Sequence, residues 1–288
     1  MNTTTNSAIA ALENALIALI SKGEIDLPLL PEVAGRVIQL AQNPDSDAAE
    51  LAKLIEGDVS LAGHVMRIAN SAVYSPNTNI ISLQQAITRL GMKLIAEIAL
   101  AASINSKLFD APEYEQHIRS ILNFSLASGL WAKEVARLSR KNVEAAFISG
   151  LLHDIGRPIA IQSLSKIKRE LAVEIEQEDL LTLEEKYQRS LGEKTVENWN
   201  MPKTIIEVVR YFENYLEPHE SQFVTMIAVA GTVIASHIIP ATKNCYCMTL
   251  EEVKQHPIFA DLNIYADEID QILSKKDNIS QTLEAMAS

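Results

Sequence analysis

Helix-starting and helix-ending residues recur along the chain, and strand signals do not. Asp58 can cap a helix whose apolar residues Leu61, Val65 and Ile68 fall on one face. Segments of this kind follow one another from residue 8 to about residue 275, separated by glycine, asparagine and proline. The pattern predicts an all-α fold.

Local residue pairs place several of the expected helix starts. Asp47 with Glu50, and Ser82 with Gln85, have the spacing of a capping box, in which the first side chain accepts from a backbone N–H three residues on. Pro31 suits the first turn of a helix, because its missing N–H costs nothing there. We therefore expect short, separately capped helices in the first hundred residues.

Composition agrees with packed helices and excludes several functions. Apolar residues make up 48% of the chain and aromatic residues only 5%, a balance that favours helices over sheets. The formal net charge is −12, so we expect neither nucleic-acid binding nor attraction to a membrane surface. The two cysteines, Cys245 and Cys247, are interpreted as loop thiols, and the N-terminus resembles no signal peptide. We expect a cytoplasmic protein.

The segment "DAPEY" at 110–114 is interpreted as a joint between two helical lobes. We divide the chain into an N-terminal helix (1–22), an N-terminal lobe (23–110), a second helical lobe (111–220) and C-terminal helices that complete it (221–288). A long helix is expected over about 113–139, followed by another over about 142–161.

The second of these expected helices contains the segment "FISGLLHDIG" at 147–156, which places His153 beside Asp154. An imidazole and a carboxylate can supply two ligands to a divalent metal, but a catalytic metal usually has at least three protein ligands. Adjacent helical residues point about 100° apart, so both reach one ion only at a helix end or distortion. The chain lacks HExxH and other recognised zinc spacings.

Four segments appear in a characteristic order: "LPLLPEVAGRVIQLAQNPDSDAAELAKLIEGDVSLAGHVMRIANSAVY" (27–74), "SLQQAITRLGMKLIAEIAL" (82–100), "FISGLLHDIG" (147–156) and "VENWNMP" (196–202). Together they resemble the HDOD family, the HD-related output domains of bacterial signalling proteins. The resemblance covers about 27–215. It implies that the second lobe is HD-domain-like, related to HD-type metal phosphohydrolases, and that the full metal set is typically absent.

The ligand positions of catalytic HD relatives can be carried over one by one, as the resemblance implies. The upstream histidine falls at Phe124, and a downstream histidine falls at Gln188. A His-His pair falls at Phe212 and Glu213, and the closing aspartate falls near Gly231. Glu213 is the one substitute ligand expected among these.

We therefore interpret the His-Asp pair as the remnant of a metal site, with no catalytic and no metal-ligating residue assigned. Its structural interpretation is that His153 and Asp154 cap and brace helices; its functional interpretation is a pocket that binds a small ligand through His153, Asp154, Gln188 and Glu213. No cofactor is expected. The alternative is a divalent metal at His153 and Asp154.

The expected function is a non-catalytic bacterial signal-transduction module that binds a signalling protein or a small signalling molecule. The first alternative is an HD-type metal-dependent phosphohydrolase acting on a nucleotide or cyclic dinucleotide. The second is a helical scaffold without a ligand. The identity of the partner, the pathway and the oligomeric state are left open by the sequence.

Overall fold

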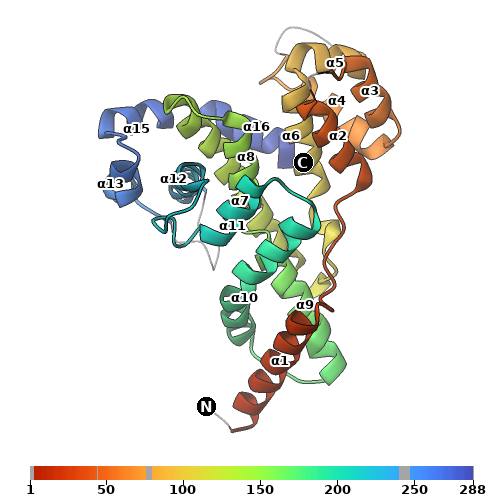
Figure 1. The fold of residues 1–288 in the computed structure, drawn as a ribbon, viewed down its shortest axis with the longest axis vertical. Helices are drawn as coiled ribbons and strands as arrows, with labels where there is room; N and C mark the ends of the chain where they lie inside the picture. The colour runs from red at the N-terminus through yellow and green to blue at the C-terminus, as the bar shows by residue number, and fades with distance from the viewer. Residues whose placement is uncertain (1–2, 44, 76–79, 240–246, 288) are drawn as a thin grey trace.

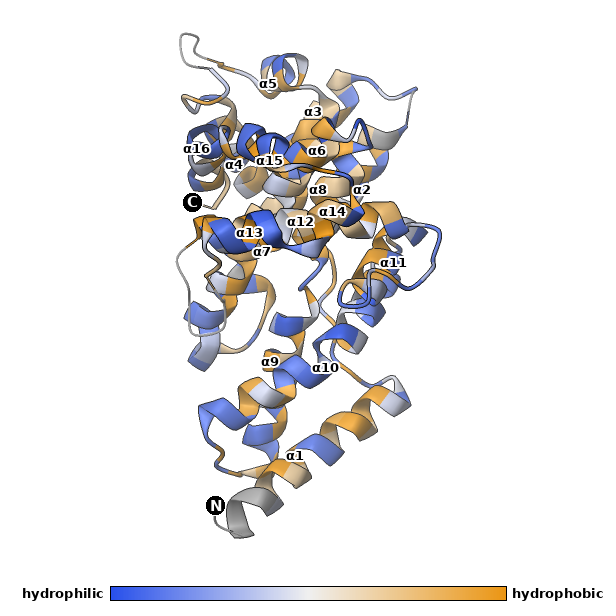
Figure 2. Cartoon of the chain, turned by 90° about the vertical axis from the view of Figure 1, so that its left-hand side faces the viewer, coloured by the Kyte–Doolittle hydropathy of each residue, from blue (hydrophilic) through white to orange (hydrophobic). Residues whose placement is uncertain are grey.

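The computed structural model describes residues 3–43, 45–75, 80–239 and 247–287, and every regular element in these ranges is helical. The all-α prediction is confirmed, and the helices form two lobes (Figure 1). One continuous cluster of buried apolar side chains runs through both lobes, from Leu12 to Met286. Figure 2 shows the apolar stripes along the helices that supply it. None of the described helices has the length and apolar character needed to cross a bilayer.

Short capped helices build the N-terminal lobe. They are α2 (Glu32–Gln42), α3 (Ala48–Glu56), α4 (Val59–Ala69), α5 (Leu83–Leu90) and α6 (Met92–Ser103). The predicted N-caps are confirmed: Asp47 Oδ1 accepts from the Glu50 N–H at 2.8 Å, and Asp58 Oδ1 from the Leu61 N–H at 3.0 Å. Each cap satisfies a backbone donor that the helix itself leaves free, so these starts are encoded locally.

The long helix α7 is the centre of the HD-like lobe. Trp131, on α7, is only 1% exposed and anchors its core. After the short 3₁₀ turns η1 (Ser106–Leu108) and η2 (Pro112–Tyr114), the helices are α7 (Glu115–Leu138), α8 (Val143–Leu152), α9 (Gly156–Leu171), α10 (Gln177–Asn198), α11 (Lys203–Tyr211) and α12 (Gln222–Ile238). Helix α7 packs against α8 and α12, and α9 packs against α10.

The two ends of the chain lie on different parts of the molecule (Figure 1). Helix α1 (Thr3–Lys22) packs on α9 and α10, at the end of the molecule opposite the N-terminal lobe. The C-terminal helices are α13 (Leu250–Gln255), α14 (Pro257–Asp261), α15 (Ala266–Leu273) and α16 (Lys276–Ala287). Helix α16 contacts α7 and also α4 and α6, so it bridges the lobes. The four residue ranges assigned from the sequence stay predictions.

The structure corrects one predicted helix. A single helix over about 142–161 was expected, but α8 ends at Leu152, residues 153–155 form a turn, and α9 begins at Gly156. The His-Asp pair therefore lies at a helix break. Of the predicted 240–248 loop, residues 240–246, including Cys245, lie outside the described residues, and Cys247 is an exposed free thiol.

Candidate functional site

Two glycine contacts hold the turn that carries His153 and Asp154. A Cβ atom on Gly150 would lie 2.7 Å from the Cα atom of Gly129 on α7. A Cβ atom on Gly156 would lie 1.8 Å from the backbone oxygen of Gln188 on α10. Both distances are shorter than any real Cβ contact, so α8 meets α7 and α9 meets α10 backbone to backbone on either side of the pair.

His153 is enclosed by protein and only 1% exposed. Its Nδ1 donates to the Gly150 carbonyl at 2.7 Å, which fixes the orientation of the ring. The Phe212 ring lies 4.5 Å from the imidazole, centroid to centroid, and the Phe124 ring lies 6.3 Å away. Two aromatic side chains therefore lie near the imidazole, at positions where catalytic relatives are expected to carry histidine. Neither ring has a lone pair for a metal.

Asp154 lies among positive charges. Its Oδ2 atom is 3.4 Å from His153 Nε2 and 3.8 Å from the Arg157 guanidinium, and 13% of its side chain is exposed. Burial alone would raise the pKa of the Asp154 carboxyl, but His153, Arg157 and Arg189 outweigh it and hold that pKa well below its usual range. Asp154 is therefore a carboxylate whose charge is already neutralised by side chains.

A second carboxylate shares the Arg157 cation. Arg157 Nε donates to Oε1 of Glu184 at 2.7 Å, and the Glu184 side chain is fully buried. The other oxygen of Glu184 lies 3.2 Å from His117 Nε2 on α7. Asp154, Arg157, Glu184 and His117 form a network, called here the Arg157 network, that links the turn between α8 and α9 to α7 and α10. A buried charge needs such partners, because isolated it would be strongly destabilising.

Arg189 connects the turn to the chain beyond α11. Its Nη1 donates to the His153 carbonyl at 2.7 Å and to the Val209 carbonyl at 3.1 Å, while Nη2 donates to Glu213 at 2.9 Å. The Glu213 side chain is 59% exposed and is paired with this guanidinium. The backbone oxygen of Gln188 lies against Gly156, the first residue of α9. The structure thus brings the four predicted residues into one neighbourhood; their role in ligand binding stays a prediction.

The remaining carried-over position, Gly231, is closed to any side chain. A Cβ atom there would lie 2.5 Å from the Ala132 nitrogen on α7, because α12 and α7 cross at this point. Within the described ranges, no three His, Cys, Asp or Glu side chains are grouped closely enough to hold a metal ion.

Sequence reasoning missed Arg157, Glu184 and Arg189. Arg157 lies three residues after Asp154, a spacing at which helical side chains meet, and this was the one signal that could have pointed to it. Glu184 is 27 residues from Arg157 and carries no local signal. The contact of His117 with Glu184 joins residues 67 positions apart and likewise carries no local signal.

Several solved structures share this fold. A Shewanella amazonensis protein, provisionally described as a metal-dependent phosphohydrolase, has a TM-score of 0.74 at 21% identity and covers 97% of this chain and 99% of its own. An HDOD domain protein of unknown function from Geobacter sulfurreducens has a TM-score of 0.69 at 17% identity, covering 98% and 97%. A Marinobacter aquaeolei protein, provisionally described as acting in signal transduction, has a TM-score of 0.66 at 20% identity, covering 97% and 66%.

A sequence relative and a family model complete the comparison. An uncharacterized protein of Treponema pallidum is 22% identical over 242 residues, which are 80% of this chain; the chain spans about half the length of that relative, 46%. The HDOD domain model matches residues 27–215, which include helices α2 to α11 and the whole Arg157 network. The chain therefore belongs to the HDOD domain family.

Proposed function

We propose that this chain is a non-catalytic bacterial signal-transduction module, active in the cytoplasm, that works by binding a protein partner or a small signalling molecule. The observation that carries the proposal is the Arg157 guanidinium, 3.8 Å from Asp154 and 2.7 Å from Glu184. A cationic side chain of the protein therefore already lies beside Asp154, the carboxylate that a metal here would need, and Glu184 holds that cation in place.

The residues present do not fit a catalytic divalent metal. Such an ion needs several lone pairs around it and an open position for water. Phe124 and Phe212 supply none, and Glu213 is paired with Arg189. His153 and Asp154 act instead as a brace: the histidine ties the turn to Gly150 and Arg189, and the aspartate holds Arg157. In this proposal the HD metal site is degenerate.

A metal-dependent phosphohydrolase is the second candidate. The observations in its favour are the intact His153-Asp154 pair, with part of the Asp154 side chain open to solvent, and the fold shared with the Shewanella amazonensis protein. Its chemistry would need a bound cation to activate water. A helical scaffold without a ligand is the third candidate, and it differs from the first only in its lack of a binding partner.

Metal analysis combined with an activity assay separates the first two candidates. The full chain is purified from cells supplemented with Mn²⁺ or Ni²⁺, and its metal content and its hydrolysis of a chromogenic phosphodiester are measured. We expect substoichiometric metal and no turnover, in the parent chain and in Asp154→Ala alike. Asp267→Ala, at an exposed position on α15, serves as the matched control. Stoichiometric metal and turnover in the parent chain, both lost in Asp154→Ala and kept in Asp267→Ala, would refute the proposal.

A further inference from the structure

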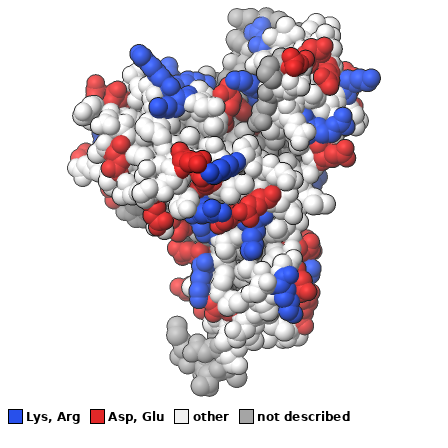
Figure 3. All heavy atoms as spheres, in the orientation of Figure 1, with Lys and Arg blue, Asp and Glu red and all other residues white. Residues whose placement is uncertain are grey.

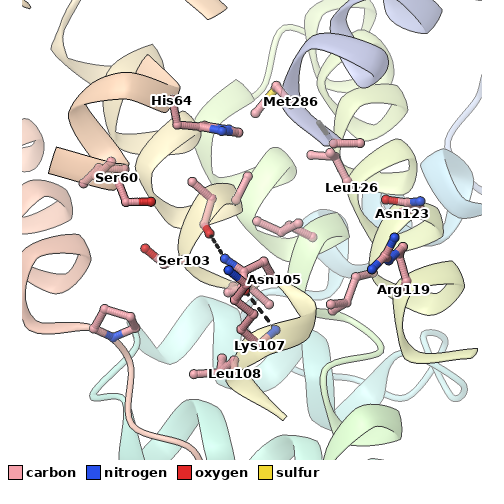
Figure 4. A pocket seen from close by; sticks show the side chains of 18 of the residues that line it. Ser60, His64, Ser103, Asn105, Lys107, Leu108, Arg119, Asn123, Leu126 and Met286 are labelled. Atoms are coloured by element: carbon pink, nitrogen blue, oxygen red, sulfur yellow. Dashed lines mark hydrogen bonds between the residues drawn. The ribbon is translucent and has the colours of Figure 1, made fainter. Parts of the chain in front are cut away.

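A cavity of about 640 Å³ lies between the lobes, separate from the His-Asp turn. Its wall residues include Ser60 and His64 on α4, Lys107 on η1, Arg119 and Asn123 on α7, and Met286 on α16 (Figure 4). This volume is within the range of small-molecule sites, about 300–1,000 Å³. A molecule held here would touch both lobes at once.

The charge of the cavity differs in sign from that of the chain. The charged side chains that line it are Lys107, Arg119 and Asp58, although the chain carries a net charge of −12. The Asp58 carboxylate is used as the cap of α4. On the face shown in Figure 3, acidic and basic side chains are interspersed. Compared with that mixed surface, the excess of positive charge in the cavity is a local feature. It favours an anionic occupant.

The two cations are positioned in different ways. Asn105 accepts from the Lys107 backbone N–H at 3.0 Å and donates to the Ala102 carbonyl at 2.8 Å, which fixes the turn that presents Lys107. Lys107 is exposed and makes no ion pair with the described residues. Arg119 uses one nitrogen on Glu115, at 2.8 Å, and the other donors of its guanidinium bond to none of the described residues.

Two uncharged polar side chains, His64 and Asn123, also line the cavity. Arg67, which can only donate, lies 2.6 Å from His64 Nδ1, so in the neutral ring the proton is on Nε2. Burial, and then Arg67, lower the pKa of His64, which favours that neutral ring; the nearby Met286 carbonyl acts in the opposite direction. Nε2 is buried and makes no hydrogen bond of good geometry with any described residue, although the Met286 carbonyl lies near the ring. A buried donor left unpaired costs about 1–3 kcal/mol, so an acceptor here would be stabilising.

The walls also offer apolar surface. Ile104, Leu126 and Leu151 are each at most 5% exposed and line the cavity together with Met286. The Asn123 amide has no hydrogen-bond partner among the described residues, although it faces the cavity beside Arg119 (Figure 4). The cavity therefore combines cations, unused amide and imidazole groups, and aliphatic packing surface.

We propose that the inter-lobe cavity binds a nucleoside monophosphate, with the phosphate at Lys107 and Arg119 and the nucleoside among Asn123, His64 and the aliphatic wall. A phosphate matches the two cations, a ribose and base supply acceptors and donors for the unpaired polar groups, and the flat base has apolar faces to pack on leucine side chains. The inference rests on the proposed signalling function and deepens it by naming a ligand class and a site.

Isothermal titration of the full chain with AMP, GMP, CMP and UMP at low salt tests the inference. We expect at least one of them to bind with a stoichiometry of one. Its nucleoside, which lacks the phosphate, should have an affinity lower by a factor of at least about ten, the factor that one charge-assisted hydrogen bond carries. Lys107→Ala combined with Arg119→Ala should weaken binding by the same factor or more. Both side chains are exposed, so these variants should fold, and unchanged melting temperatures would verify this.

Control variants localise the site. Lys194→Ala, at an exposed position on α10, removes one positive charge outside the cavity and should leave the affinity unchanged. Lack of binding by all four nucleotides, equal binding of the free nucleoside, or full affinity in the Lys107/Arg119 variant would overturn the inference. Loss of affinity in Asp154→Ala would place the ligand at the His-Asp turn instead, which also overturns it. None of these results depends on metal content or turnover, which test the proposed function separately.

Discussion

Replacing Arg157 by methionine tests whether its guanidinium is the resident cation of the His-Asp turn. The substitution keeps most of the aliphatic stem and removes the charge that lies 2.7 Å from Glu184 and 3.8 Å from Asp154. Glu184 is fully buried, so its carboxylate would lose its nearest cation without gaining water. Removal of one partner from a buried ion pair costs about 3–5 kcal/mol.

This cost can be converted into a melting temperature. At about 2.1 cal/mol/K per residue, unfolding of 288 residues has an entropy of about 0.6 kcal/mol/K, so Tm should fall by about 5–8 °C. Circular dichroism at 222 nm, a wavelength that follows helix content, measures the shift on heating and in urea. A decrease in Tm below about 2 °C would refute the assignment of Arg157 as the neutralising cation.

A double-mutant cycle separates the charge effect from simple loss of packing. Glu184→Gln removes the buried negative charge, so the double variant should be less destabilised than the sum of the single variants by about 1–3 kcal/mol. Strict additivity would mean that the two side chains are close in space but not coupled in energy, and that the free energy lost in Arg157→Met comes from packing.

Three further predictions concern stability. Gly156→Ala should destabilise by about 3 kcal/mol or more, because its Cβ would meet backbone atoms of α10, whereas Gly63→Ala, with open space around it, should be neutral or stabilising. Asp154 has a lowered pKa in the folded state, so its stabilising contribution is present above the ordinary value of 3.8 and lost as the pH falls below it; the difference in urea stability between the parent chain and Asp154→Asn should shrink accordingly. In the buried pair between α6 and α7, Lys133→Met alone should cost about 3–5 kcal/mol, while Glu97→Leu with Lys133→Met should be neutral or stabilising by up to about 4 kcal/mol in the same urea titration.

Features encoded within a few residues were predictable from the sequence. The caps at Asp47 and Asp58 bond to backbone groups three residues away, so spacing alone located both helix starts. The break after Leu152 was not predictable in this way. Gly156 reads as one more helical residue until α10 is seen against it, 32 residues further along the chain at Gln188.

The same distinction between locally encoded features and long-range contacts applies to the candidate site. His153 and Asp154 were identified because they are adjacent, and their neighbourhood with Gln188 and Glu213 followed from the family resemblance. The feature that decides their chemistry, the Arg157 side chain held by Glu184, depends on a contact between α9 and α10. No periodicity or motif in one sequence encodes which lysine, arginine or histidine will face a given carboxylate after folding.

A His-Asp pair in this fold is therefore explained without a metal. The turn between α8 and α9 needs a side chain that can bond the end of α8, and His153 does so through Gly150. It also needs a carboxylate to compensate the Arg157 guanidinium, and Asp154 supplies it. Since these roles suffice to keep both residues in place, the pair alone does not separate a hydrolase from a binding module. The neighbours support the proposed binding module: Phe124 and Phe212 offer no lone pairs to a metal, and the Arg157 guanidinium already lies beside Asp154.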